Sequence, residues 1–555
     1  MQLLPSHENH FKPIVLVLVS LLNFGGCYCY DNPSALKSQL QQHFSTLAKA
    51  DYEMYFNLLY SVYSVPNIVL PLFGGVLTDK LGPRWVLFGV TSLMLLGQFI
   101  FALGNSLESF SVMLVRFAGR VVFGFGGETV SVAQASLLAL WFPSSELAFA
   151  NGILISIQRL ATASNNELSP FLAEHWSVTS ATWFGVLVCA ISFVAMLGLV
   201  PIDAKAEQQI QDDVLTDQEN QNERVFKQHI RLADAATFSW TFWLIGALYF
   251  LIYAIVGPFN NVASSIFLER DYFRTPPPLC QRCGLGAYAN DIFCTTQSSV
   301  CPPLTNSPFA HPLPLLSATC AAIIDPVDQF SCSTLPPYLD DAAINCDAIA
   351  WKEGPYTHAY CQSKYAAEQA AAAPLSFVPM LMAVTAPVFG YWVDHVGRRT
   401  LIAVVAMMAI ALAHALLGFT SVSLFLPLAM QGLATCLFLS ASWPAVAYCV
   451  EPHHVGTAYG ILSASVNLGL AIVPMFVVVE YNAMHMYIPY VHVVFMGLAI
   501  LGIAVAIVLV FLDLRNGGVL YAANMQYAPS QVMPEVEKGY LLPKPMKAYG
   551  TSAVS

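Results

Sequence analysis

The sequence predicts an all-α membrane protein with twelve transmembrane helices in two pseudo-symmetric bundles of six. Of its 555 residues, 56% are hydrophobic and only 10% are charged, a composition typical of polytopic membrane proteins and not of soluble enzymes. Twelve apolar runs are long enough to cross about 30 Å of hydrocarbon, and one loop motif occurs in each group of six. The first group covers residues 11–30, 54–77, 85–104, 108–141, 147–171 and 178–200. The second group covers residues 240–267, 372–392, 400–420, 423–449, 456–480 and 488–512.

A short motif follows both the second and the eighth apolar run. The two copies read GGVLTDKLGPRW and GYWVDHVGRRTL, and both place a glycine four residues before an aspartate and another three residues after it. The two halves are equivalent only if residues 11–30 form the first helix, so we predict that this run is retained and is not a cleaved signal peptide. The matching positions, 315 residues apart, are Gly75, Asp79 and Gly82 in the first copy and Gly390, Asp394 and Gly397 in the second.

The motif resembles the loop between helices 2 and 3 of the major facilitator superfamily, which recurs between helices 8 and 9; the resemblance implies transport by alternating access. Asp79 and Asp394 are placed to cap neighbouring helix ends and to pair with cations on the same face. Such contacts form in the outward-open state and break when the cytosolic side opens, so we expect them to set the conformational equilibrium. The alternative is a loop that is basic only because it is cytosolic. The expected cations are Lys80, Arg84, Arg398 and Arg399.

The distribution of Lys and Arg predicts the orientation, because short cytosolic loops carry an excess of these residues. The short loops on one side of the predicted membrane contain no Lys or Arg. The other side is therefore predicted to be cytosolic, together with both termini. Its basic residues are Lys80, Arg84, Arg398, Arg399 and Arg515.

Two charges lie deep in the apolar runs on either side of the short turn FPSS. Glu128 is 13 residues before Trp141, and Arg159 is 13 residues after Glu146. At about 1.5 Å per residue, both lie roughly 20 Å from the same membrane face if the runs are antiparallel helices. Charges at that depth cost roughly 2.5–3.5 kcal/mol each and normally face a bundle interior or a water-filled cavity. An acid and a base at equal depth suit a ligand that carries both charges; a structural ion pair between the helices is the alternative.

Three phrases resemble one branch of the superfamily, the lysosomal dipeptide uniporters: LLYSVYSVPNIVLPLFGG, GRVVFGFGGETVSVAQ and WPAVAYCVEPHHVGTAYG. The resemblance covers nearly all of the membrane region but not the long loop or the tails. In that branch a glutamate in helix 4 and an arginine in helix 5 hold the two ends of the dipeptide, and the matching positions are Glu128 and Arg159. The resemblance also points to Trp443 as a substrate contact. Arg120 fits the superfamily's Arg-x-x-x-Gly-x-Gly pattern and is predicted to be structural or gating, not a ligand contact.

Polar segments divide the chain into bundles and connections. Residues 1–200 are predicted to form the first bundle, and an acidic cytosolic linker at 201–235 joins it to the second bundle, residues 236–513. A lumenal loop at 269–368 separates helices 7 and 8, and a cytosolic tail follows at 514–555.

The lumenal loop is where the sequence departs from the family. It contains eight of the 13 cysteines, and an even count on the non-cytosolic side predicts a disulfide framework. Its Cys-x-x-Cys pair lacks a second ligand pair at zinc spacing, so no metal site is predicted. The branch resemblance implies a glycosylated single-span partner; the loop either replaces this partner or docks it, and a homodimer is a further option. The candidate disulfide cysteines are Cys280, Cys283, Cys294, Cys301, Cys320, Cys332, Cys346 and Cys361.

The C-terminal tail contains a candidate sorting signal. The sequence EKGYLL fits an acidic dileucine motif, with Glu537, Leu541 and Leu542 as its defining residues. A clathrin adaptor is the expected reader. Together with the branch resemblance, the motif predicts the membrane of a lysosome or a lysosome-like vacuole.

Several classes of function remain open at this point. We predict a transporter that moves zwitterionic dipeptides out of the lysosome by uniport. The alternatives are a carrier for an amino acid, organic anion or sugar, a proton-coupled carrier, and a sensor or scaffold that transports nothing. Proton-coupled peptide carriers have a Glu-rich cluster in helix 1, which the phrase NFGGCYCY lacks. The sequence shows no nucleophile–base pairing or phosphate loop, so we expect no enzyme activity, no cofactor and no nucleic-acid partner.

Overall fold

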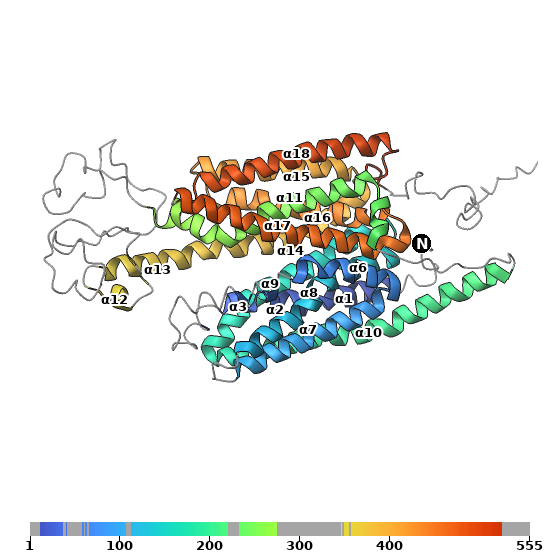
Figure 1. Cartoon of the computed structure of the whole chain (residues 1–555), viewed down its shortest axis with the longest axis horizontal. Helices are drawn as coiled ribbons and strands as arrows, with labels where there is room; N and C mark the ends of the chain where they lie inside the picture. Colours follow the sequence, from blue (N-terminus) through green and yellow to red (C-terminus); the bar gives the residue numbers. More distant parts are fainter. Residues whose placement is uncertain are drawn as a thin grey trace, which may run out of the picture.

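The computed structural model contains helices and no strand among the residues that it describes, as expected for an all-α fold. Figure 1 shows two bundles of long helices side by side, with the first half of the chain (blue to cyan) in one and the second half (green to red) in the other. The described residues are 11–36, 40, 58–59, 62–63, 66–106, 113–219, 232–274, 344, 346, 349–354, 357–484 and 486–523.

The first bundle follows the predicted order of crossings. A break at Asn23 divides the first crossing into two helices, and a 3-10 turn precedes α6 in the second. The helices are α1 (Lys12–Leu22), α2 (Phe24–Tyr30), α3 (Asn32–Ala35), η2 (Pro66–Ile68), α6 (Leu70–Leu81), α7 (Pro83–Asn105), α8 (Met113–Trp141), α9 (Leu147–His175) and α10 (Val178–Glu219).

The second bundle repeats this arrangement. The 3-10 helix η4 (Leu232–Thr237) leads into it, and the Ser239 side chain then accepts the Phe242 N–H at 3.4 Å, as an N-cap does. The helices that follow are α11 (Trp240–Phe267), η5 (Leu268–Tyr272, a π-helix), α12 (Ile349–Lys352), α13 (His358–Ala372), η10 (Ala373–Ser376), α14 (Phe377–Val396), α15 (Arg399–Phe419), α16 (Phe425–Ala445), η11 (Val446–Tyr448), η12 (Pro452–His454), α17 (Val455–Met484) and α18 (Tyr490–Arg515).

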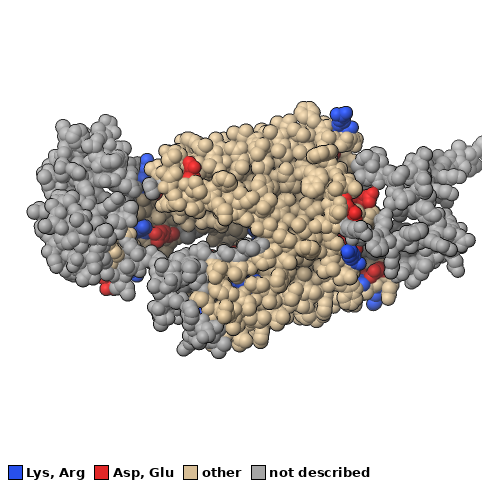
Figure 2. All heavy atoms as spheres, viewed as in Figure 1, with Lys and Arg blue, Asp and Glu red and all other residues tan. Residues whose placement is uncertain are grey.

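Ten helical segments among the described residues are long and apolar enough to cross a membrane. The other two predicted crossings correspond to α6, which has 12 residues and overlaps only the end of the predicted run, and to α9, which has 29 residues but is more polar. On the face shown in Figure 2, charged side chains gather towards the two ends of the molecule, and the surface between them is almost uncharged. This distribution is the one that a membrane-spanning bundle requires.

Two helices extend beyond the boundaries that the sequence suggested. α10 continues past residue 200 to Glu219, although Pro201 lies inside it, and Figure 1 shows its end projecting from the bundle. The Ala, Lys, Glu and Gln residues after Pro201 favour the helical state, which explains the continuation. At the other end of the molecule, α13 begins inside the segment predicted as a loop, continues past its end to Ala372 and leads through η10 into α14.

The two bundles meet through two equivalent helix pairs, α6 with α17 and α14 with α9. Glycine permits the close approach in both. A Cβ atom added at Gly75 would collide with the Gly456 carbonyl oxygen, and one added at Gly390 would collide with the Ala148 carbonyl oxygen. The repeated motif therefore contributes its first glycine to each contact between the bundles.

We predict that Gly390→Ala separates α14 from α9 and lowers the apparent Tm of the purified protein. Overpacking of this kind typically costs about 1–3 kcal/mol, because the carbonyl of Ala148 is backbone and cannot move aside alone. Gly89→Ala in α7 is the matched control, since no atom lies within 4 Å of the added Cβ. Equal thermal stability of the two variants would contradict the proposed close contact.

Candidate functional site

Asp79 holds the start of α17. Its carboxylate accepts hydrogen bonds from the backbone N–H groups of Gly456 and Thr457, both at 2.6 Å, and from the Thr457 hydroxyl at 2.6 Å. A helix N-terminus has unpaired N–H groups and a partial positive charge, so a carboxylate there is stabilising. Burial raises the pKa of Asp79 to about 6, so the group is charged at neutral pH and loses its charge in acid.

Asp394 makes the equivalent contact from the second bundle. It accepts the N–H groups of Ala148 at 3.0 Å and Phe149 at 2.7 Å, at the start of α9. The Arg399 guanidinium lies 3.8 Å from it and also donates to the Ala522 carbonyl at 2.8 Å. We call the contacts of Asp79 and Asp394 the latch, and the end of the molecule that contains them the latch end; the end with α12 and α13 is the loop end.

The other basic residues of the motif do not touch the latch aspartates. Arg84 pairs with Asp203 at 3.2 Å and with Glu207 at 2.6 Å, both in α10 of its own bundle. Lys80 and Arg398 are exposed. Of the four predicted cations, Arg399 alone therefore lies within ion-pair distance of a latch aspartate among the described residues.

A hollow lies between the two bundles. Figure 2 shows that it opens towards the loop end. The latch joins the bundles at the opposite end, where Asp79 and Asp394 each bind a helix of the other bundle. The structure is therefore closed at the latch end and open towards the loop end.

Glu128 and Arg159 lie beside this interface but do not pair with each other. Glu128 of α8 accepts a hydrogen bond from Ser463 of α17 at 3.4 Å, across the interface. No ion pair between the two charges occurs in the described part of the chain, and the Arg159 Nε is buried without a hydrogen-bond partner. Both charges act electrostatically on Tyr253 of α11 and on Cys27 of α2. The two charges therefore lie near the same two side chains, and neither is the ion-pair partner of the other.

A third charge, Asp31, lies beside Arg159. Asn32 donates to the Asn165 side chain of α9 at 3.2 Å, with both residues fully buried, so the turn after the first crossing is fixed to α9. This places Asp31 next to Thr162, its hydrogen-bond partner, and within electrostatic range of Arg159. Burial raises the pKa of Asp31 to about 6. Its carboxyl is mostly neutral below that pH and mostly charged above it.

Arg120 supports the same turn from the other side. Its guanidinium donates to the carbonyl oxygens of Cys29 and Tyr30, both at 3.1 Å, and is fully buried. The Tyr63 ring lies 5.3 Å from the guanidinium carbon, within the range of a cation–π interaction. These contacts describe a residue that positions the end of the first crossing.

Aromatic side chains occupy the second bundle's side of the interface. The Trp443 ring lies 5.4 Å from that of Tyr249 and 5.1 Å from that of Tyr459, whose hydroxyl donates to the Trp443 carbonyl at 3.0 Å. Tyr249 in turn stacks on Tyr253 at 6.4 Å, the residue that both central charges act on. Trp443 is thus linked to the charges through two tyrosines, and the structure shows no direct contact between Trp443 and either charge.

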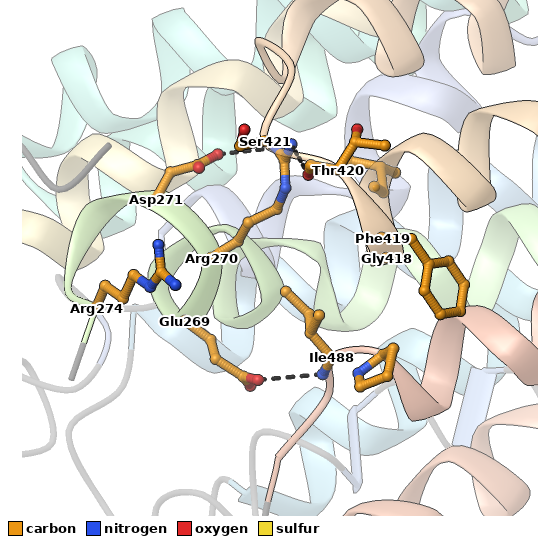
Figure 3. A pocket seen from close by; sticks show the side chains of 11 residues that line it. Glu269, Arg270, Asp271, Arg274, Gly418, Phe419, Thr420, Ser421 and Ile488 are labelled. Carbon is orange, nitrogen blue, oxygen red and sulfur yellow. Dashed lines mark hydrogen bonds and ion pairs between the residues drawn. The ribbon is translucent and has the colours of Figure 1, made fainter. Parts of the chain in front are cut away.

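A separate cavity of about 610 Å³ lies at the loop end. In Figure 3, Arg270 points towards the Thr420–Ser421 segment and Glu269 towards Ile488. Arg270 donates to the Thr420 carbonyl at 2.9 Å, and Glu269 accepts the Ile488 N–H at 3.1 Å. Arg270 thus binds the loop between α15 and α16, and Glu269 binds the loop between α17 and α18. We therefore assign both charges a structural role.

The remaining predicted residues divide between described and undescribed parts of the chain. A disulfide joins Cys346 to Cys361, at the C-terminal end of the predicted loop. The other six candidate cysteines lie outside the described residues, and so do Glu537, Leu541 and Leu542 of the predicted sorting signal.

The sequence profile of the Major Facilitator Superfamily matches residues 16–267 and 349–533, which is most of the chain. The chain belongs to this superfamily. The lysosomal dipeptide transporter MFSD1 of Homo sapiens is 28% identical over 480 residues, which cover 84% of this chain and 79% of the relative. MFSD1 of Bos taurus is 27% identical over the same shares. The solved structure of the proton:xylose symporter XylE has a TM-score of 0.55 at 12% identity, over 94% of this chain and 98% of that one.

Membership in the superfamily makes this chain a multi-pass membrane transporter. Sequence reasoning proposed Glu128 and Arg159 but did not single out Asp31 or Ser463. The signal for Asp31 was present, since it is an acid immediately after an apolar run. Its proximity to Arg159 depends on how α3 packs against α9, which a sequence pattern does not show.

We predict that Asp79→Ala and Asp394→Ala each open the latch end. Loss of an N-cap typically costs about 0.5–2 kcal/mol, so the open population should rise by up to about 30-fold. The measurement is the labelling rate of a cysteine placed at Ser156. Ser156 of α9 is half-buried, and its hydroxyl donates a hydrogen bond to the Ala383 carbonyl of α14. Glu207→Gln, an exposed acid of α10, is the control. Labelling that stays at the control rate would show that these contacts do not close the latch end.

Proposed function

We propose that this protein is a lysosomal uniporter that carries zwitterionic dipeptides out of the lysosome. The observation that carries this proposal is that Glu128 and Arg159 both act electrostatically on Tyr253 but do not pair with each other. A ligand with a free ammonium and a free carboxylate satisfies both charges at once. The described hydrogen-bond partners of Glu128, Ser463 and Asn467, are both neutral. A buried charge is costly unless an opposite charge lies beside it, so the site favours such a ligand over a neutral one.

The role of each residue follows from its charge. The Glu128 carboxylate binds the substrate's ammonium group, and the Arg159 guanidinium binds its carboxylate, for which its planar donors are well suited. The backbone of an extended dipeptide spans about 7 Å, so charges that are not themselves paired suit its two ends. The tyrosines and Trp443 on the opposite bundle provide a mostly apolar surface, which suits side chains of varied shape.

The relatives support the same substrate class and compartment. The proteins of Homo sapiens and Bos taurus named as lysosomal dipeptide transporters match 84% of this chain. Uniport is proposed because the first crossing carries no acidic cluster. A proton-coupled carrier is the second candidate, since Glu128 and Asp31 both lie in the site.

The test is uptake of labelled dipeptides into liposomes that contain the purified protein. Glu128→Gln removes the negative charge, and Arg159→Lys keeps the positive charge but loses the planar donors of the guanidinium. A charge-assisted hydrogen bond contributes about 1.5–3 kcal/mol. We expect each variant to bind dipeptides about 10- to 150-fold more weakly while remaining folded. N-acetylated and C-amidated dipeptides should not compete in the wild type. Equal competition by capped peptides would show that the charges do not hold the substrate's ends.

The same liposomes distinguish uniport from proton coupling. A proton gradient without a substrate gradient should produce no accumulation, whereas a substrate gradient alone should produce flux and counterflow. Dipeptide accumulation that an ionophore abolishes would show proton coupling in place of uniport. It would not contradict the assignment of dipeptides as the substrate.

We further predict that Asp31 makes substrate binding sensitive to pH. Because the pKa of Asp31 is raised to about 6, its carboxyl is mostly neutral at pH 5 and mostly charged at pH 7. The charged form competes with the substrate carboxylate for Arg159, so affinity should fall by about tenfold, or roughly 1.4 kcal/mol, between these values. Asp31→Asn should flatten this part of the pH profile, measured by dipeptide binding in detergent. A profile that Asp31→Asn leaves unchanged would rule out this role.

A further inference from the structure

Three metal-ligating side chains gather in the turn between α16 and α17. Glu451, His453 and His454 each offer one ligand atom, and these atoms all lie within 4.8 Å of one another. The Glu451 Oε2 is 3.1 Å from the His453 Nε2, and the two imidazole rings have centroids 4.2 Å apart. The turn includes η12 and immediately precedes the helix start that Asp79 holds.

The cluster combines a buried ligand with accessible ones. His454 is only 7% exposed, and its Nδ1 has no hydrogen-bond partner. Its ring lies 5.9 Å from that of Phe238, which shields one side. The His453 and Glu451 side chains are 31% and 39% exposed, so an ion can reach them from solvent. Asp234 of η4 acts electrostatically on His454 and adds negative charge beside the cluster.

We propose that Glu451, His453 and His454 form a binding site for a divalent transition-metal ion of the Zn²⁺ class. Two imidazoles and one carboxylate are ligands that Zn²⁺ accepts in tetrahedral sites, with a fourth position left for water or another oxygen. Mg²⁺ and Ca²⁺ prefer sites made of oxygen ligands, so the two histidines disfavour them.

The simpler explanation is a surface ion pair between His453 and Glu451. Such pairs contribute little to stability, and this one would involve two of the three side chains. It does not account for His454, whose buried Nδ1 is unpartnered while its ring lies against that of His453. A cation held by all three side chains explains why they converge.

The position of the site gives the ion a consequence for the latch. Gly456 and Thr457, which Asp79 binds, follow His454 by two and three residues. α6 of the first bundle contacts both η12 and η4. A bound ion would restrain the turn from which α17 starts, and so would favour the closed latch end.

The binding test uses the full-length protein in detergent, stripped of metal with a chelator. Isothermal titration with Zn²⁺, and the visible absorption of Co²⁺ as a report of nitrogen ligation, measure affinity and stoichiometry. We expect one ion per chain in the wild type and at least tenfold weaker binding in Glu451→Gln and in His453→Asn, two partly exposed positions. His175→Asn removes an exposed imidazole at the loop end and should bind like the wild type.

Hydrogen–deuterium exchange locates the ion without any substitution. Zn²⁺ should slow amide exchange by at least threefold in residues 446–460 of the wild type, and the variants should lose this protection. No saturable binding, protection confined to another part of the chain, or unchanged affinity in both variants would each overturn the proposal. Because neither measurement uses a dipeptide, the result is independent of the proposed transport function.

Discussion

The interaction on which the rest of the structure depends is a carboxylate that binds the start of a helix in the other bundle. Asp79 and Asp394 each accept two backbone N–H groups, and a helix N-terminus offers these donors only in its first turn. The contact is therefore short-ranged and is either made or broken. Glycine at Gly75 and Gly390 lets the backbones approach closely enough for both carboxylates to reach. Two such contacts at one end leave the space between the bundles open at the other.

The helices that the latch holds also carry the site. α9 starts at the residues that Asp394 binds and carries Arg159 about three turns later. α17 starts at the residues that Asp79 binds and carries Ser463, a hydrogen-bond partner of Glu128. If the latch opens, α9 moves relative to α14 and α17 moves relative to α6. The surroundings of Arg159 and of Glu128 must then change together, which is the coupling that alternating access needs.

The sequence predicted the features that depend on local periodicity and missed those that depend on tertiary contacts. The helical rise alone placed Glu128 and Arg159 at one depth, and the repeated motif identified the two latch aspartates. The partner of Arg84 was not predictable in the same way. Asp203 and Glu207 were assigned to a linker, but α10 continues through them, and their spacing of four places both on one helix face. They therefore bind Arg84 within the first bundle. The Asp79 carboxylate does not pair with Arg84 and instead binds the start of α17.

The two bundles contribute different chemistry to the space between them, although their folds are equivalent. Glu128, Arg159 and Asp31 all belong to the first bundle, whereas the second contributes Ser463 and the ring cluster of Tyr249, Tyr253 and Trp443. Fixed charges are costly to bury and are only useful if a ligand presents complementary charges at fixed positions. Rings tolerate many apolar shapes. A carrier divided in this way can recognise the constant ends of its substrate with one bundle and accept variable side chains with the other. Such a division requires that the acid and the base do not pair with each other when the site is empty, and the negative charge of Asp31 beside Arg159 offsets part of the cost of that arrangement.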